Sequence, residues 1–230
     1  MTLRILVVDD QPIARAGIAT MLDAEDDIVV VGQSGDGEEA LRDALATRPD
    51  VVVMDIRMPR LDGISATRLI TAALNCAVVL ITTFDDDEHL FDGIAAGASG
   101  FLLKTSGGDL IAAAVRSAAR GDSLIDPAMT RVLIEQAVSP TPPRQADAGQ
   151  QAVLESLSDR EKDMLDAVAR GLSNLDIAKE LFLSPATVKT HISALLSKTG
   201  SSTRVQAAVF AFQSGFTQPG TAPDTATRRR

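Results

Sequence analysis

The chain has 230 residues, of which 45% are hydrophobic, and it carries one cysteine and no Trp or Tyr. That apolar content excludes wholesale disorder, and a single cysteine excludes both an intramolecular disulfide and a zinc site built from cysteines. The first residues do not have the design of a signal peptide, and no apolar run approaches the ~20 residues of a membrane-spanning helix. We therefore expect a soluble cytoplasmic protein without a membrane partner.

The first half of the chain alternates short runs rich in Val and Ile with longer segments whose apolar residues recur every three or four positions. The short runs predict five β-strands, over residues 3–8, 28–33, 50–54, 77–82 and 99–103. The longer segments predict helices over residues 13–22, 38–46, 63–72, 88–96 and 108–120. This alternation predicts a flavodoxin-like α/β domain over residues 1–122, with a doubly wound, five-stranded parallel sheet of order 2-1-3-4-5.

Residues 123–153 are expected to connect this domain to a second one. Pro127–Val138 predicts a helix capped by Asp126, and residues 139–151 contain three prolines and almost no apolar side chain, which is typical of an extended linker. Beyond it the pattern predicts helices over residues 159–170, 174–181, 185–198 and 203–213. These four helices indicate a compact all-α domain over residues 154–216, followed by a disordered tail at residues 217–230.

The net charge of −9 is distributed unevenly between the two halves. Residues 1–138 hold 22 acidic and 11 basic side chains, whereas residues 139–230 hold 9 acidic and 11 basic ones. The first part is therefore acidic by 11 charges, and the second is basic by 2. This contrast predicts two domains with different partners.

Three aspartates and one lysine directly follow strands of the predicted sheet. Asp9 and Asp10 follow the first strand, Asp55 the third and Lys104 the fifth. Since the carboxyl ends of parallel strands meet at one edge, these side chains should gather in a crevice at the switch point of the sheet. Mg²⁺ would relieve the repulsion among the carboxylates, and a carboxylate beside it can attack phosphorus to form an aspartyl phosphate. For any one aspartate, a solvated strand end or a helix cap is an equally good explanation.

The blocks LVVDDQP, VVMDIRMPRLDG, LITTF and AGASGFLLKT occur in this order within residues 3–120. They closely resemble the receiver domain of two-component response regulators. The resemblance implies that Asp55 accepts a phosphoryl group, and that Asp9 and Asp10 hold Mg²⁺ with the help of the backbone carbonyl of Arg57.

The same resemblance implies roles for three further residues. Lys104 pairs with the phosphate, Thr82 reports on it, and Phe101 is the aromatic partner of that switch. The family spacing to the lysine selects Thr82 rather than its neighbour Thr83.

The segment LSDREKDMLDAVARGLSNLDIAKELFLSPATVKTHISALLSKTG resembles the helix-turn-helix output domain of LuxR-type regulators. Together with the receiver, this places the resemblance in the NarL/FixJ class. The residues support helix starts independently: Ser158 and Glu161 form a capping box, and Ser184 followed by Pro185 starts the third helix.

The third helix has one apolar stripe and one small, polar face that is free of acids, as suits a helix entering the major groove of DNA. The residues expected to contact DNA are Lys179, Ser184, Thr187, Lys189, Thr190, His191, Ser193 and Lys198. Of these, Lys189, Thr190 and Ser193 are suited to base edges, whereas Lys179, His191 and Lys198 are suited to phosphates. The alternative is a merely solvated helix face.

The last helix carries apolar residues at helical spacing, namely Val205, Ala208, Val209 and Phe212. Part of this stripe is expected to pack in the core, and the family resemblance implies that its outer portion is a dimer contact. A homodimer would present two recognition helices to half-sites about 34 Å apart in an inverted-repeat operator.

These features predict a transcriptional regulator controlled by phosphorylation. A sensor histidine kinase would phosphorylate Asp55 in the presence of Mg²⁺, which would switch dimerisation and DNA binding. Apart from self-phosphorylation and autodephosphorylation at Asp55, no enzymatic activity is expected. One alternative is a phosphorylation-independent DNA binder with a docking receiver. The other is a metal-dependent phosphatase, which would lack a second acid where Arg57 stands.

Overall fold

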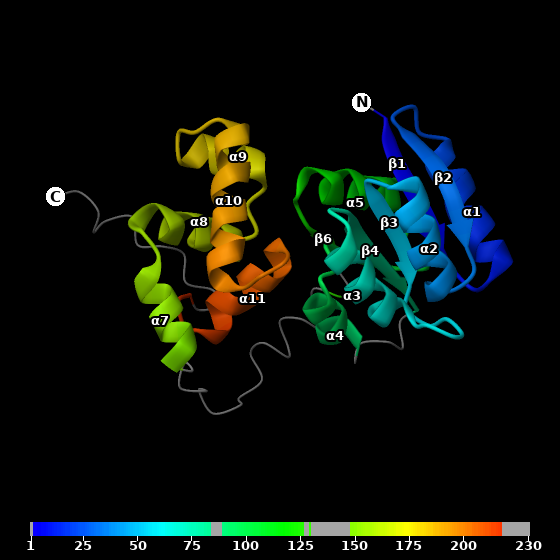
Figure 1. The fold of residues 1–230 in the computed structure, drawn as a ribbon. Coiled ribbons are helices and arrows are strands. Elements are labelled where there is room, and N and C mark those ends of the chain that lie inside the picture. The colour runs from blue at the N-terminus through cyan, green and yellow to red at the C-terminus, as the bar shows by residue number, and fades with distance from the viewer. Residues whose placement is uncertain (1, 84–88, 127–128, 130–147, 218–230) are drawn as a thin grey trace. The chain divides into compact units, whose positions relative to one another are not determined.

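The computed structural model describes residues 2–83, 89–126, 129 and 148–217. The chain divides into two compact units, an N-terminal α/β unit and a C-terminal helical unit (Figure 1). In the described part of the chain, every helix is too short or too polar to cross a bilayer.

The N-terminal unit is built on a six-stranded sheet of order β2-β1-β3-β4-β5-β6, in which every neighbouring pair is parallel (Figure 1). The expected order of the first five strands is confirmed. Their bounds are β1 Leu3–Val8, β2 Ile28–Ser34, β3 Val51–Asp55, β4 Ala77–Thr82 and β5 Gly100–Leu103. The central strands are buried on both faces, which explains why their sequences are apolar almost throughout.

A sixth strand, β6 (Leu124–Ile125), corrects the expectation of five strands. It pairs with β5 in the register Gly100↔Leu124 and Phe101↔Ile125. Two residues are too few for any periodic pattern, so the sequence carries no signal for this strand. The correction also moves residues 124–125 from the expected linker into the sheet.

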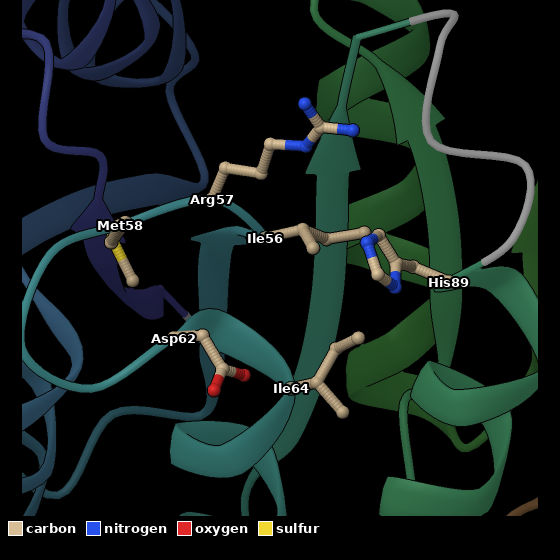
Figure 2. Close-up of a pocket in the computed structure, with 6 residues that line it drawn as sticks. All are labelled: Ile56, Arg57, Met58, Asp62, Ile64 and His89. Atoms are coloured by element: carbon tan, nitrogen blue, oxygen red, sulfur yellow. The ribbon is translucent and has the colours of Figure 1, made fainter.

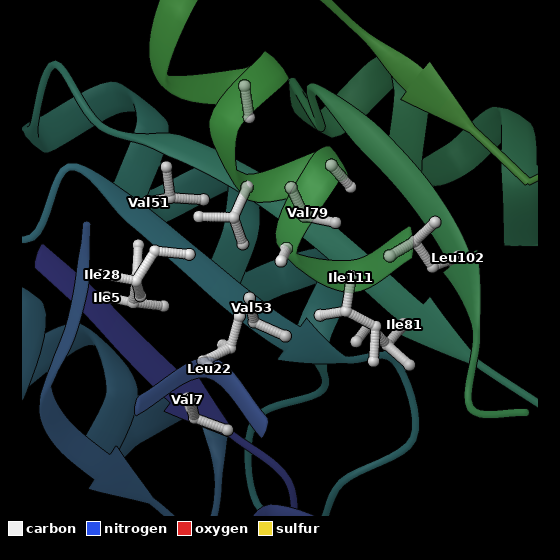
Figure 3. Close-up of a cluster of buried hydrophobic side chains, with 14 of the residues drawn as sticks. Ile5, Val7, Leu22, Ile28, Val51, Val53, Val79, Ile81, Leu102 and Ile111 are labelled. Carbon is white, nitrogen blue, oxygen red and sulfur yellow. The ribbon is translucent and has the colours of Figure 1, made fainter. Parts of the chain in front are cut away.

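Five helices cover the two faces of the sheet. Their bounds are α1 Pro12–Asp23, α2 Gly37–Thr47, α3 Gly63–Ala73, α4 Leu90–Ala96 and α5 Gly108–Arg120. Leu22 of α1 and Ile111 of α5 pack against Val53, Val79 and neighbouring residues on one face (Figure 3). Helices α2, α3 and α4 pack side by side on the other face.

The C-terminal unit contains five described helices instead of the expected four: α7 Ala148–Ser156, α8 Asp159–Ala169, α9 Asn174–Glu180, α10 Pro185–Thr199 and α11 Arg204–Gln213. The additional helix is α7, which occupies the end of the expected linker. Its sequence, AGQQAVLES, has no apolar side chain larger than alanine before Val153, so no helical periodicity stands out. Nevertheless Leu154 and the following Leu157 are buried with Met164, Val168 and Val188 in one core.

The expected connection over residues 123–153 therefore overlaps β6 near its start and α7 at its end. Most of the helix expected over residues 127–138, the centre of the expected linker and the tail after residue 217 lie outside the described residues. Met129 is described, and it is helical and buried.

Candidate functional site

Three carboxylates meet at the carboxyl edge of the parallel sheet. Asp9 and Asp10 follow β1. Asp55 is the last residue of β3, whereas the sequence predicted that it would come directly after this strand. Because β1 and β3 are paired neighbours, one ligand atom from each aspartate lies within 4.8 Å of the others. Asp9 and Asp55 are buried, and Asp10 is exposed. The crevice predicted from the strand ends is therefore present.

Lys104 joins this cluster from the end of β5. Its Nζ lies 2.8 Å from an oxygen of Asp9 and 2.8 Å from an oxygen of Asp55. The backbone amide of Lys104 donates to the carbonyl of Thr82 at 2.7 Å, which fixes the start of the side chain. Burial lowers the pKa of Lys104, but hydrogen bonds to Asp55 and Asp9 outweigh burial and raise it, so the ammonium stays charged.

Burial dominates the ionisation of Asp55. It raises the pKa of this carboxyl from 3.8 to about 6, although the hydrogen bond and the charge of Lys104 act in the opposite direction. The carboxylate of Asp9 raises the pKa further. The buried carboxylate is thus held in a site that does not fully compensate its charge.

The donor set fits a hard divalent cation. One lysine faces three carboxylates, so two negative charges are left for an ion to neutralise. Among the described residues, the buried Oδ2 of Asp9 has only the ion-pair contact with Lys104 and no well-aligned hydrogen bond. Oxygen-only ligands, some buried and one exposed, are the arrangement that suits partly hydrated Mg²⁺.

The loop that follows Asp55 is folded tightly back on the site. The amide of Gly63 donates to the carbonyl of Ile56 at 2.9 Å, and a Cβ at Gly63 would lie 1.9 Å from the carbonyl oxygen of Asp55. Arg60, with φ of 65°, forms an ion pair with the fully buried Asp36 that caps α2. The loop that presents Arg57, the residue expected to offer its carbonyl, is therefore fixed at both ends.

A cavity of about 390 Å³ lies beside this loop (Figure 2). Its lining residues are Ile56, Arg57, Met58, Asp62, Ile64 and His89. None of the three clustered aspartates lines it. The cavity is therefore adjacent to the carboxylate site and separate from it.

The two expected switch residues are both buried. Thr82 ends β4, and its hydroxyl donates to the carbonyl of Thr83 at 3.2 Å. Phe101 is fully buried on β5, and its ring approaches Gly93 of α4 so closely that a Cβ there would lie 2.6 Å from Phe101 Cζ. Phe101 therefore lies beneath α4 rather than at the carboxylates.

The expected recognition helix is α10. Ser184 caps it by accepting a hydrogen bond from the amide of Thr187, and Pro185 stands at its first turn, as predicted. Val188, Ile192 and Leu195 are buried, whereas Leu196 is only half-buried.

The opposite side of α10 carries the residues expected to contact base edges. Lys189, Thr190 and Ser193 are exposed, and Thr187 is half-buried. The hydroxyls of Thr190 and Ser193 donate to carbonyls one turn earlier, at 3.1 and 3.0 Å. These hydroxyls therefore have to reorient before they can donate to a base.

The three residues expected at phosphates differ in their surroundings. Lys179 is largely exposed, with Asp176 at 3.3 Å. His191 is half-buried. Lys198 extends toward α8, where its Nζ lies 2.8 Å from Glu161 Oε2. Sequence reasoning found the capping box that contains Glu161 but did not connect it to Lys198, 37 residues away.

Helix α11 buries a different stripe from the one predicted for it. Ala207 and Ala211 are fully buried in the helical core. Of the expected stripe, Val205 is buried, whereas Ala208, Val209 and Phe212 are half-buried. The half-buried residues remain available for the expected dimer contact.

Comparison with known proteins matches both units. Residues 5–116 match the family described as response regulator receiver domain, and residues 155–211 match the luxR family of bacterial regulatory proteins. The chain is 39% identical over 217 residues to the uncharacterized transcriptional regulatory protein YxjL of Bacillus subtilis, covering 94% of this chain and 98% of that protein. It is 39% identical over 211 residues to the transcriptional regulatory protein LiaR of the same organism, covering 91% and 96%.

A solved structure is similar over both units as well. The crystal structure of the response regulator ChrA of a heme-sensing two-component system is 36% identical, with a TM-score of 0.52, and the match covers 94% of this chain and 99% of that one. The similarity to these relatives extends over nearly the whole chain. The chain therefore belongs to the LuxR-family response regulators, with a receiver domain followed by a LuxR-type DNA-binding domain.

Proposed function

We propose that Asp55 accepts a phosphoryl group from a sensor histidine kinase and that this modification controls dimerisation and DNA binding by the C-terminal domain. The observation that carries the proposal is the position of Lys104 Nζ, 2.8 Å from both Asp9 and Asp55 in a cluster of three carboxylates. A lysine ammonium among carboxylates can form ion pairs with the oxygens of an incoming phosphoryl group.

In the proposed transfer, a carboxylate oxygen of Asp55 attacks phosphorus, a bond from oxygen to phosphorus forms, and the bond from phosphorus to the imidazole nitrogen of the donor breaks. The imidazole leaves with the electron pair and takes up a proton. Asp9, Asp10 and the carbonyl of Arg57 would hold Mg²⁺, which supplies charge neutralisation at the transferring group. Because the pKa of Asp55 is about 6 without the metal, its carboxylate is mostly ionised at neutral pH.

Phosphorylation is proposed to rearrange Lys104, Thr82 and Phe101. Lys104 leaves the carboxylate of Asp55 for phosphoryl oxygens. The Thr82 hydroxyl, now bonded to the carbonyl of Thr83, turns toward the same oxygens, and Phe101 repacks beneath α4. Such a rearrangement shifts an equilibrium between two states of the receiver. Hydrolysis of the acyl phosphate by water returns the starting state.

In the output domain, the exposed side of α10 is proposed to enter the major groove. Lys189, Thr190 and Ser193 would contact base edges, and Lys179 and His191 would contact phosphates. The exposure of the first four of these residues supports the assignment. The half-buried residues of α11 would form part of the contact between two copies, which fits an operator with two half-sites.

The test has two stages with the full chain. First, protein is incubated with a phosphodonor and Mg²⁺, and intact-mass measurement compares wild type with Asp55→Ala; a modified wild type and an unmodified variant are expected. Second, both proteins select duplexes from a random pool, with and without the phosphodonor. Paired half-sites enriched only by phosphorylated wild type are expected. Equal enrichment by Asp55→Ala would favour a regulator that works without phosphorylation.

A further inference from the structure

The residues at the end of the receiver are attached to the strand that precedes Lys104. β6 pairs with β5, and the amide of Asp126 donates to the carbonyl of Phe101 at 2.8 Å. The backbones approach so closely that a Cβ at Gly100 would lie 2.8 Å from the carbonyl oxygen of Leu124. The edge strand β6 and Asp126 are thus fixed to β5, the strand that ends just before Lys104.

Ser106 joins Asp126 to the turn that carries Lys104. Its hydroxyl donates to Asp126 Oδ2 at 2.7 Å and accepts from the amide of Leu103 at 3.2 Å. The amide of Ser106 donates to the carbonyl of Leu103 at 2.9 Å, so Lys104 and Thr105 lie within a closed turn. Asp126 is 8% exposed, and a hydrogen bond to a buried charged acceptor is among the stronger side-chain hydrogen bonds.

The two ends of Lys104 are therefore held by different parts of the receiver. Its backbone amide is bound to Thr82, and its ammonium bridges Asp9 and Asp55. Its turn is also bonded through Ser106 to Asp126, 20 residues further along the chain. A change in the position of the ammonium is thereby connected, through one short turn, to Asp126.

We propose that Ser106 and Asp126 are positioning residues for Lys104, and that their hydrogen bond carries the state of the phosphorylation site to the edge strand β6. The inference rests on the proposed phosphorylation of Asp55. The coupling is reciprocal: if the bond favours the arrangement that binds a phosphoryl group, a bound phosphoryl group strengthens the bond by the same factor. Phosphorylation therefore stiffens β6 and the residue that follows it.

The test uses the full chain with Mg²⁺ and beryllofluoride as the phosphoryl mimic. In wild type, the mimic is expected to slow amide hydrogen exchange in residues 122–126. Ser106→Ala is expected to bind the mimic roughly threefold to tenfold more weakly, as for the loss of one hydrogen bond, and to lose this slowing. Asp126→Ala, which removes the acceptor, should have at least as large an effect, and adding Ser106→Ala to it should weaken binding no further, because both changes remove the same bond.

Two matched variants separate positioning from a general loss of structure. Ser106→Thr keeps the hydroxyl and should restore both the affinity and the slowed exchange. Thr105→Ala removes an exposed hydroxyl from the same turn and should change neither. Unchanged exchange in residues 122–126 of a wild type that binds the mimic would overturn this inference alone. Failure of wild type to bind the mimic would overturn the proposed phosphorylation site and this inference with it.

Discussion

Replacing Lys198 by Met is expected to destabilise the output domain without removing a DNA contact. Lys198 Nζ lies 2.8 Å from Glu161 Oε2, so the end of α10 is bonded to the start of α8. The lysine side chain is 45% exposed, and the solvated pair is therefore worth about 0.5–1 kcal/mol. Glu161 keeps hydrogen bonds from the amide and hydroxyl of Ser158 at 2.8 Å. In a domain of this size, the loss corresponds to a fall of about 3–6 °C in Tm.

Helix geometry separates this role from a phosphate contact. Nine residues separate Lys189 from Lys198, which is two and a half turns, so the two lysines lie on opposite sides of α10. Each phosphate neutralised by a protein cation contributes about 0.9 to the slope of log affinity against log salt concentration. We expect Lys179→Met, at a proposed phosphate contact, to reduce that slope by about this amount and Lys198→Met to leave it unchanged.

The assay combines calorimetric unfolding of the full chain with DNA binding over a range of salt concentrations, using a duplex selected by wild type. The receiver transition serves as an internal control, since neither lysine belongs to that domain. A slope that falls equally in both variants would refute the reasoning and return Lys198 to the phosphate contacts expected from the sequence. An unchanged Tm in Lys198→Met would show that the pair with Glu161 does not stabilise the domain.

The same pair predicts a pH dependence. Hydrogen bonds from Lys198, then from Ser158, lower the pKa of Glu161 from 4.5 to about 2. Because the folded-state pKa is below the unfolded value, this stabilisation is fully present above pH 4.5 and is lost as the pH falls through 2. The difference in unfolding free energy between wild type and Lys198→Met should therefore shrink across this range.

Three further predictions concern the receiver. Arg60→Ala should cost about 1–2 kcal/mol in urea unfolding, because the fully buried Asp36 loses its ion-pair partner but keeps two backbone donors; Asp36→Asn should recover most of this loss in the double variant. Gly63→Ala should lower Tm and prevent phosphorylation, because the new Cβ would collide with the Asp55 carbonyl. The control is Gly17→Ala in α1, where the new Cβ meets open space; this variant should stabilise the receiver by about 0.5–1 kcal/mol. Asp55→Asn should raise the Tm of Mg²⁺-free protein above pH 6, because wild type is destabilised there by a buried carboxylate. This gain in Tm should vanish below pH 3.8, where the carboxyl is protonated in both the folded and the unfolded protein. A gain that persists below pH 3.8 would contradict burial of the charge as its cause.

Much of the phosphorylation site could be predicted from the sequence because its residues stand at strand ends. Once the strands and their order are known, Asp9, Asp55 and Lys104 have to meet at one edge of the sheet. Local capping rules likewise identified the starts of α8 and α10 through Ser158 and Ser184. In each case, the signal lies within a few residues of the feature that it predicts.

The sequence around the features that were not predicted carries no local pattern that indicates them. β6 is two residues long, and α7 has no apolar side chain larger than alanine before Val153. In α11, the core includes Ala207 and Ala211, which lie outside the predicted stripe, whereas Ala208, Val209 and Phe212 of that stripe are half-buried. Sequence periodicity identified the helix but could not decide which of two apolar sides faces the core.

The sequence by itself therefore determined the first five strands, the starts of α8 and α10, the division into an acidic and a weakly basic part, and the residues that gather at the sheet edge. These follow from backbone propensity, periodicity and the geometry of parallel sheets, which act over short distances in the chain. Only the tertiary structure decided the partners of Asp126 and Lys198, which lie 20 and 37 residues from Ser106 and Glu161. Such pairs form only when packed helices and strands bring distant side chains together. From the sequence alone, Asp126 is identified only as a helix cap and Lys198 only as a basic side chain.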